Sequence, residues 1–221
     1  MNIFIDLDGP ILNNMPRFYS VYFNLVNALG FKPLSESYYW KLKRACINEE
    51  TILRKTGCFD QKFIQAYIKQ RIKNIENKEY LSLNKVTDRC RNSLRFLSKQ
   101  GNLILVTARK SKENLMWELK QKGLYSYFKK VLCDFNDTIT AWELKFDLIN
   151  RFVGHINAND IIIGDTEAEI LCGKKLGIYS IGVANGIRNY RQLSVLKPDM
   201  IVKNLTGVVR SWAKIEKEAE I

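Results

Sequence analysis

The chain has 221 residues, of which 46% are hydrophobic, so it is long enough for one sizeable core with a smaller subdomain and too apolar for a largely disordered protein. Its formal net charge of +12 indicates a surface that attracts anions, whether phosphorylated metabolites, nucleic acid or acidic lipid. No apolar run is long enough to span a bilayer and no signal segment opens the sequence, so we expect a cytoplasmic protein without membrane spans.

The cysteine and histidine pattern argues against a zinc site. The five cysteines are far apart in the sequence, no CxxC pair occurs, and His155 is the single histidine. We expect most of the thiols to be small buried apolar groups in a reducing compartment.

The first predicted element is a short strand that ends on two carboxylates. Ile3, Phe4 and Ile5 form an apolar run typical of a central parallel strand buried on both faces. Asp6 and Asp8 follow at its carboxyl end, where ligands bind in open α/β sheets. Two carboxylates this close repel each other unless a cation or a shared proton intervenes. A strand followed by a simple Asx turn is the alternative.

A helical insert follows the first strand. Apolar residues recur at helical spacing over residues 16–30, 35–47 and 60–75, and no convincing strand is predicted between Leu12 and Val86. We therefore expect residues 15–86 to form a small helical subdomain. Residues 15–87 hold 13 Lys+Arg and 6 Asp+Glu, so more than half of the excess positive charge lies in this insert. A solvated helix surface is the usual meaning of such a count, and a basic roof over an anion site is the alternative.

From Thr87 onward, predicted strands alternate with helices, which indicates an α/β fold with a parallel sheet and right-handed crossovers. A last helix is expected from Leu205 through Ile215, and the charged end from Lys214 is expected to fray. The predicted strands cover residues 103–106, 131–133, 161–163, 178–183 and 200–202, and the helices residues 87–100, 111–122, 138–152 and 166–176.

Two of these strands also end on polar residues. Thr107 and the backbone N–H groups after it are suited to holding a phosphate oxygen where the next helix begins, although a threonine here is more often a turn residue. Asp165 follows a buried strand and suits an oxygen-loving cation such as Mg2+. Glu169 has the spacing of a capping box with Thr166, so a helix cap and an outer-shell metal role are both open. Lys145 lies in a predicted helix beside its apolar face, where a solvent-facing charge is the ordinary expectation.

In this order the residues resemble the motifs of the haloacid dehalogenase (HAD) superfamily of phosphohydrolases. Asp6-Leu7-Asp8-Gly9 is similar to the first motif, Thr107 to the second, Lys145 to the third, and Gly164-Asp165 with Glu169 to the fourth. The resemblance covers nearly the whole chain and implies a Rossmann-like parallel sheet flanked by helices, formed by residues 1–14 and 87–221, with residues 15–86 as an inserted all-helical cap of the C1 type.

The later sequence, including residues 177–183 and 197–202, is similar to phosphoglycolate-phosphatase-like members of this superfamily. Three positions depart from the usual pattern. Pro10 stands where Thr or Val is common after the first motif, Ala108 replaces the frequent Asn or Gly after Thr107, and Glu169 stands where Asp is common.

The resemblance implies a role for each motif residue. Asp6 would be the nucleophile that forms an aspartyl-phosphate, and Asp8 the general acid/base. Mg2+ would be held by Asp6, the backbone carbonyl of Asp8 and Asp165, with Glu169 in the outer shell. The phosphoryl oxygens would be held by Asp6, Thr107, Ala108 and Lys145. An acid at position 8 argues against dehalogenation, because a halide leaves without a proton.

These expectations favour a Mg2+-dependent phosphatase acting on a small phosphorylated metabolite, for example a phosphoglycolate-like one, with Arg17, Lys43 and Arg44 of the insert as candidate substrate residues. A phosphosugar mutase is the enzymatic alternative. The charge of +12 keeps a basic nucleic-acid-binding protein and a nucleic-acid 3′-phosphatase open. A monomer and a dimer are both compatible with the sequence.

Overall fold

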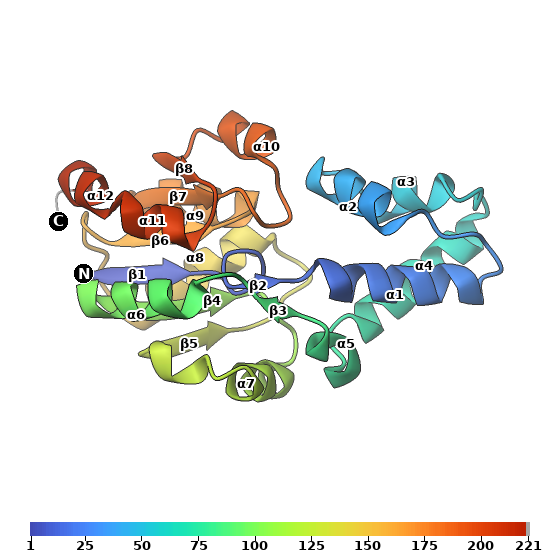
Figure 1. Cartoon of the computed structure of the whole chain (residues 1–221), viewed down its shortest axis with the longest axis horizontal. Coiled ribbons are helices and arrows are strands. Elements are labelled where there is room, and N and C mark those ends of the chain that lie inside the picture. The colour runs from blue at the N-terminus through green and yellow to red at the C-terminus, as the bar shows by residue number, and fades with distance from the viewer. Residues whose placement is uncertain (220–221) are drawn as a thin grey trace. The chain divides into compact units, whose positions relative to one another are not determined.

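The computed structural model describes residues 1–219 and divides the chain into two compact units (Figure 1). Met1–Asn13 and Val86–Ile221 make up the α/β unit, and Asn14–Lys85 make up the helical unit. The predicted division, residues 1–14 and 87–221 against residues 15–86, lies one residue later at each boundary.

The α/β unit is built on one parallel sheet of six strands in the order β5-β4-β1-β6-β7-β8. All five neighbouring pairs are parallel, so the predicted α/β class with a parallel sheet is confirmed. The first strand lies in the middle of the sheet (Figure 1). The strands are β1 (Asn2–Ile5), β4 (Asn102–Thr107), β5 (Lys130–Cys133), β6 (Ile161–Gly164), β7 (Tyr179–Val183) and β8 (Met200–Val202).

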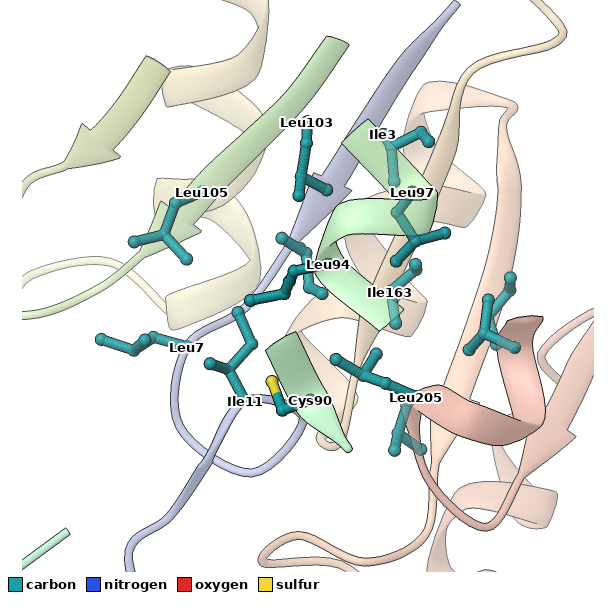
Figure 2. Close-up of a cluster of buried hydrophobic side chains, with 14 of the residues drawn as sticks. Ile3, Leu7, Ile11, Cys90, Leu94, Leu97, Leu103, Leu105, Ile163 and Leu205 are labelled. Atoms are coloured by element: carbon teal, nitrogen blue, oxygen red, sulfur yellow. The ribbon is translucent and has the colours of Figure 1, made fainter. Parts of the chain in front are cut away.

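Helices cover both faces of this sheet, which explains the unbroken apolar run of β1. Ile3 and Ile5 belong to one buried cluster with Leu94 and Leu97 of α6, shown in Figure 2, whereas Phe4 belongs to a second cluster with Leu148 of α8. Successive side chains of a strand point to opposite faces, so a strand buried on both faces must be apolar at every position. The helices are α6 (Cys90–Gln100), α7 (Lys112–Gln121), α8 (Ala141–Val153), α9 (Glu167–Leu176), α10 (Tyr190–Val195), α11 (Leu205–Arg210), α12 (Trp212–Glu218) and a short 3-10 turn, η1 (Tyr125–Tyr127).

The helical unit has its own core, centred on two stacked tyrosines. The rings of Tyr22 and Tyr39 lie 4.4 Å apart, and Tyr67 meets Tyr22 edge-on. Such arrangements add to the stabilisation that burial of the rings already supplies. The helices of this unit are α1 (Met15–Ala28), α2 (Glu36–Arg44), α3 (Glu49–Arg54), α4 (Gln61–Asn74) and α5 (Lys78–Ser82).

Several local predictions differ from the structure. Two strands of two residues, β2 (Leu12–Asn13) and β3 (Lys85–Val86), pair with each other at the margins of a region predicted to hold no strand. The last helix divides at Ser211 into α11 and α12. Of the end expected to fray, residues 214–218 lie in α12, where Ile215 is fully buried, and residues 220–221 lie outside the described residues. All five cysteines are free. Among residues 1–219, no helix has the length and apolar character needed to cross a membrane.

Candidate active site

The register of the central strands places three predicted site residues at one edge of the sheet. Ile5 is paired with Leu105 on one side and with Ile163 on the other. Asp6 and Asp165 therefore come directly after adjacent strands, and Thr107 is the last residue of β4, the strand on the other side of β1. Asp6 N donates to Ile163 O at 3.0 Å. Ala108 comes directly after Thr107 at the end of β4.

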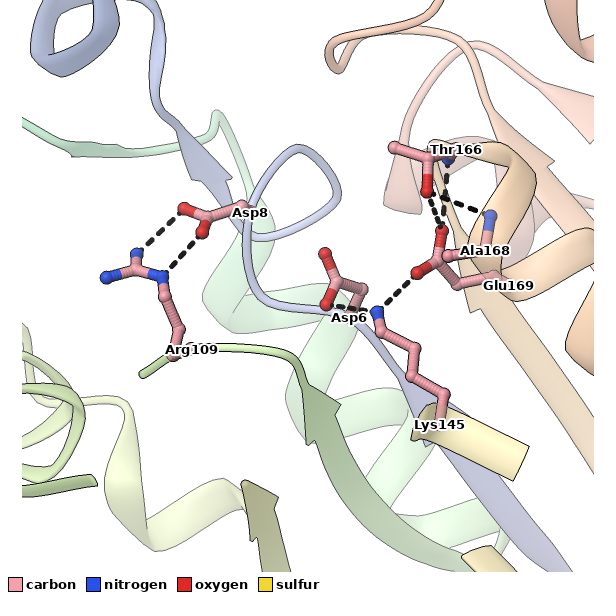
Figure 3. Close-up of polar contacts among 7 residues, drawn as sticks. All are labelled: Asp6, Asp8, Arg109, Lys145, Thr166, Ala168 and Glu169. Carbon is pink, nitrogen blue, oxygen red and sulfur yellow. Dashed lines mark hydrogen bonds and ion pairs between the residues drawn. The ribbon is translucent and has the colours of Figure 1, made fainter. Parts of the chain in front are cut away.

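Lys145 reaches this edge from α8 and forms ion pairs with two carboxylates (Figure 3). Its Nζ lies 2.7 Å from Asp6 Oδ1 and donates a second hydrogen bond to Glu169. The residue is only 3% exposed, so the usual solvent-facing position of a helical lysine does not apply. Burial alone would lower the pKa of Lys145, but Asp6 and Glu169 outweigh it and raise the pKa, which keeps the ammonium charged.

The Asp6 carboxyl group is held in an environment that disfavours its charge. Its pKa is raised to about 7, chiefly by burial. The negative charges of Glu169 and Asp8 act in the same direction as burial, and Lys145 opposes them. A cation beside Asp6 would favour the charged form.

Asp165 carries the strongest sign of a cation site. It is fully buried, and its Oδ2 accepts a hydrogen bond from Ile187 N at 2.6 Å. Its Oδ1 is also buried and has no hydrogen-bond partner within residues 1–219. Burial raises the pKa of Asp165 well above its usual range, and the nearby Glu169 and Asp6 add to this. Because a buried polar atom without a partner is costly, this oxygen is suited to a bound cation.

The carboxylate oxygens at this sheet edge are a ligand type that Mg2+ accepts. No group of three or more His, Cys, Asp or Glu side chains in the described part of the chain is arranged to hold a metal ion. Mg2+ keeps several waters and commonly binds one or two carboxylates together with substrate phosphate. The two carboxylates of Asp6 and Asp165 match this requirement.

Glu169 forms the capping box of α9 and also contacts Lys145. Its Oε2 accepts from Thr166 N at 3.0 Å and from Thr166 Oγ1 at 2.8 Å, while Oε1 accepts from Lys145 (Figure 3). The helix-cap interpretation is confirmed. Both oxygens accept hydrogen bonds, and the Oε1 contact joins Glu169 to the ammonium that also contacts Asp6.

Glycine at position 9 is required by the close approach of Asp165. Gly9 has φ +103°, and a Cβ there would lie 2.2 Å from Asp165 Cγ. Pro10 suits the next position because it donates no hydrogen bond: the turn is closed by Ile11 N and Leu12 N, which both donate to Leu7 O. The carbonyl of Pro10 accepts from Thr87 Oγ1 at 3.2 Å. The proline thus occupies a turn whose hydrogen bonds to Leu7 O are donated by Ile11 and Leu12.

Asp8 is held by an arginine that sequence reasoning missed. Arg109 Nε lies 2.6 Å from Asp8 Oδ2, and Nη2 lies 2.9 Å from Oδ1 (Figure 3). The same Nη2 lies 3.2 Å from Glu118 Oε2 of α7. Arg109 comes two residues after Thr107, and an arginine so close to a candidate phosphate-binding strand end was the available signal.

The three candidate substrate residues of the insert all lie in the helical unit. Lys43 Nζ lies 2.7 Å from Glu49 Oε1, so this lysine belongs to an internal ion-pair network. The Arg17 guanidinium lies 4.9 Å from the centre of the Phe18 ring, a cation–π contact. Arg44 is the last residue of α2.

Comparison with known proteins agrees with this arrangement. Residues 3–183 match the family model of haloacid dehalogenase-like hydrolases. The chain is 20% identical over 215 residues to a phosphoglycolate phosphatase of Pseudomonas fluorescens (strain Pf0-1), covering 94% of this chain and 78% of that protein.

Solved structures share the fold. A haloacid dehalogenase-like family hydrolase from Streptococcus pneumoniae superposes with a TM-score of 0.76 at 18% identity, covering 96% of this chain and 97% of that one. A predicted phosphatase from Clostridium acetobutylicum superposes with a TM-score of 0.72 at 20% identity, covering 100% and 98%. With the family model matching most of the chain, this protein belongs to the haloacid dehalogenase-like hydrolases.

Proposed function

We propose that this protein is a Mg2+-dependent phosphatase that hydrolyses a small phosphorylated metabolite through an aspartyl-phosphate on Asp6. The observation that carries the proposal is the pairing of Asp6 with the buried Lys145 beside Asp165, whose Oδ1 lacks a partner within residues 1–219. Phosphoryl transfer requires a nucleophile and positive charge around the transferring group. At this edge of the sheet, Asp6 would supply the first, and Lys145 and a cation bound to Asp165 the second. Family membership and the relative named a phosphoglycolate phosphatase support the same activity.

The proposed chemistry has two displacements. In the first, an Asp6 oxygen attacks phosphorus, the bond from phosphorus to the ester oxygen breaks, and Asp8 donates a proton to the departing alkoxide. In the second, Asp8 takes a proton from water as the water oxygen attacks the aspartyl-phosphate, which releases inorganic phosphate and regenerates Asp6. Each proton that Asp8 gives is thus recovered, and the sum of the steps is ester hydrolysis.

Electrostatic groups around Asp6 would stabilise the transferring phosphoryl group. Lys145 carries its charge to within 2.7 Å of Asp6, where it offsets repulsion between the nucleophile and an anionic substrate. Thr107 and the Ala108 N–H lie at the end of the adjacent strand and would hold phosphoryl oxygens. Bound Mg2+ would neutralise further charge. It would be held by the carboxylates of Asp6 and Asp165 and the Asp8 backbone carbonyl.

In the proposed enzyme, the helical unit determines which phosphorylated metabolite is bound. Arg17 and Arg44 are the retained candidates for contact with the non-phosphate end of the substrate. Lys43 is less suitable, because its ammonium is already paired with Glu49 at 2.7 Å. A phosphoglycolate-like substrate is the first to test, since the curated relative bears that activity in its name.

The test is a phosphate-release screen over a panel of phosphorylated metabolites, with Mg2+ and with EDTA, using Asp6→Asn as the inactive control. We expect Mg2+-dependent release from at least one metabolite and none from the variant. Release that survives EDTA, or persists in Asp6→Asn, would contradict the mechanism. Isomerisation of a phosphosugar without net phosphate release would identify a mutase instead.

A further inference from the structure

Arg109 forms a bidentate, hydrogen-bonded ion pair with Asp8. Nε and Nη2 lie 2.6 Å and 2.9 Å from the two carboxylate oxygens. This side-by-side arrangement fixes both the position and the plane of the carboxylate, because the guanidinium is a rigid planar fork. The Arg109 side chain is 5% exposed and that of Asp8 is 20% exposed. The contact is therefore better defined than a surface ion pair, which solvent and side-chain motion weaken.

Glu118 contacts the same arginine nitrogen that donates to Asp8 Oδ1. It lies on α7, is fully buried, and its Oε2 is 3.2 Å from Arg109 Nη2. A buried carboxylate is costly unless a cation accompanies it, so Glu118 and Arg109 require each other. The series Glu118–Arg109–Asp8 thereby links α7 and the end of β4 to the loop after β1.

The geometry separates Arg109 from the nucleophile. In Figure 3, Arg109 lies on one side of Asp8, whereas Asp6 lies on the other side with Lys145. The arginine contacts each of the two Asp8 oxygens once, through Nε to Oδ2 and through Nη2 to Oδ1. Arg109 thus contacts Asp8 on the side away from Asp6.

We infer that Arg109, backed by Glu118, is the positioning residue that orients the Asp8 carboxylate for proton transfer to and from the substrate oxygen. This inference rests on the proposed function, in which Asp8 is the general acid/base. It concerns two residues, Arg109 and Glu118, that the motif comparison leaves without a role. The arginine supplies orientation, and Asp8 supplies the proton.

The decisive experiment compares substrates whose leaving groups differ in their need for a proton. The kcat/KM value reports steps through the first irreversible one, here phosphoryl transfer to Asp6. An alkyl phosphate needs a proton on its leaving oxygen, whereas p-nitrophenyl phosphate does not. Since general acid catalysis contributes about 100-fold or more, we expect Arg109→Gln to lower kcat/KM at least about tenfold for the alkyl phosphate and less than about threefold for p-nitrophenyl phosphate.

A second arm tests whether Arg109 works through Asp8. With phenyl phosphate, Arg109→Gln should lower kcat/KM in the wild-type background and cause no further loss in the Asp8→Asn background, because coupled residues are non-additive. Equal losses for all substrates, or a full additional loss in Asp8→Asn, would overturn the inference and indicate a phosphate-binding or purely structural role.

Milder variants keep the test decisive if Arg109→Gln fails to fold. Arg109→Lys retains the charge but loses the fork, and Glu118→Gln retains the shape but loses the charge, so both should show the same leaving-group dependence to a smaller degree. The matched control is Arg151→Gln, which removes an exposed pair with Asp134 at 3.5 Å and should leave both kcat/KM values unchanged. Failure of the proposed function is distinguishable, because it appears in the wild type as release that does not depend on Mg2+ or Asp6.

Discussion

The ammonium of Lys145 lies 2.7 Å from the carboxylate of Asp6, although 139 positions separate the two residues in the sequence. The contact is possible because α8 presents Lys145 at the edge where β1 ends, with Leu144 and Leu148 of the same helix packed in the core beneath. Because Lys145 is buried there, its ammonium neutralises the charge of the proposed nucleophile and is not exposed to solvent.

Substitution of Lys145→Met should lower kcat by about 100-fold, since removal of one preorganised electrostatic contact to the transferring group costs about that much. The stability of the variant should also fall, because Asp6 and Glu169 remain buried without their cation. Steady-state kinetics and thermal unfolding measure the two effects. The control is Lys175→Met, an exposed lysine of α9, which should change neither. Activity retained within about threefold of wild type in Lys145→Met would remove the lysine from the mechanism.

Asp165→Asn should abolish stabilisation of the protein by Mg2+. A ligand that binds only the folded state stabilises it by about 2.7 kcal/mol at a concentration about 100 times its Kd, which raises Tm. The wild-type Tm should rise as Mg2+ is titrated, and the variant Tm should not, because a carboxylate with a partnerless buried oxygen becomes a neutral amide. Differential scanning calorimetry provides this readout independently of turnover. An equal rise in both proteins would place the cation elsewhere.

Gly9→Ala should be far more disruptive than the same change at Gly123. Both glycines have positive φ, +103° and +60°, so alanine is strained at each, at a cost of order 1 kcal/mol or more. Only at Gly9 does the added Cβ meet another group, 2.2 Å from Asp165 Cγ, whereas nothing lies within 4 Å at Gly123. In Gly9→Ala, the free energy of unfolding measured with urea and the rise of Tm on addition of Mg2+ should both be smaller than in the wild type. Gly123→Ala should keep the rise of Tm with Mg2+. Similar behaviour of the two variants would contradict the close packing of Gly9 on Asp165.

Glu49→Gln should destabilise the helical unit by about 3 kcal/mol at pH 7, because Glu49 is the shared carboxylate of a buried network. It accepts from Lys43 Nζ and from Tyr67 OH at 2.7 Å each, and Arg71 Nε lies 3.1 Å away. The matched control is Glu50→Gln on the same helix, which removes a more exposed pair with Arg54 and should cost less than about 1 kcal/mol. Urea denaturation followed by circular dichroism measures both.

The same network makes the loss dependent on pH. Burial alone would raise the pKa of Glu49, but Arg71 and Lys43 outweigh it and lower the pKa below its usual 4.5. The stabilisation is therefore fully present above pH 4.5 and is lost as the pH falls through the lowered value in the folded state. The difference in unfolding free energy between wild type and Glu49→Gln should be constant from pH 7 to pH 5 and shrink below pH 4.5. A difference that stays constant down to pH 3 would exclude an ionised Glu49 as its source.

The pattern of apolar residues along the sequence was sufficient to predict the central strands and the residues at their carboxyl ends. Apolar runs marked the central strands because both faces of the sheet are covered, and the residue after each run was therefore at a sheet edge. The pattern of the sequence alone placed Asp6 and Asp165 in this way. Short elements were missed: α3, α5 and α10 span only five or six residues, which is too few for a helical period to emerge.

The contacts between the site side chains could not be predicted from the sequence pattern. The sequence determined by itself that Asp6, Asp8, Thr107 and Asp165 lie at or shortly after the carboxyl ends of strands, because a strand buried on both faces is an unbroken apolar run and parallel strands end on the same edge of a sheet. Only the tertiary structure decided that Lys145 turns inward to Asp6, and that Arg109 grips Asp8 across 101 positions while Glu118 supports it. Such contacts depend on how helices pack on the sheet, and the spacing of residues along one chain carries no record of that packing.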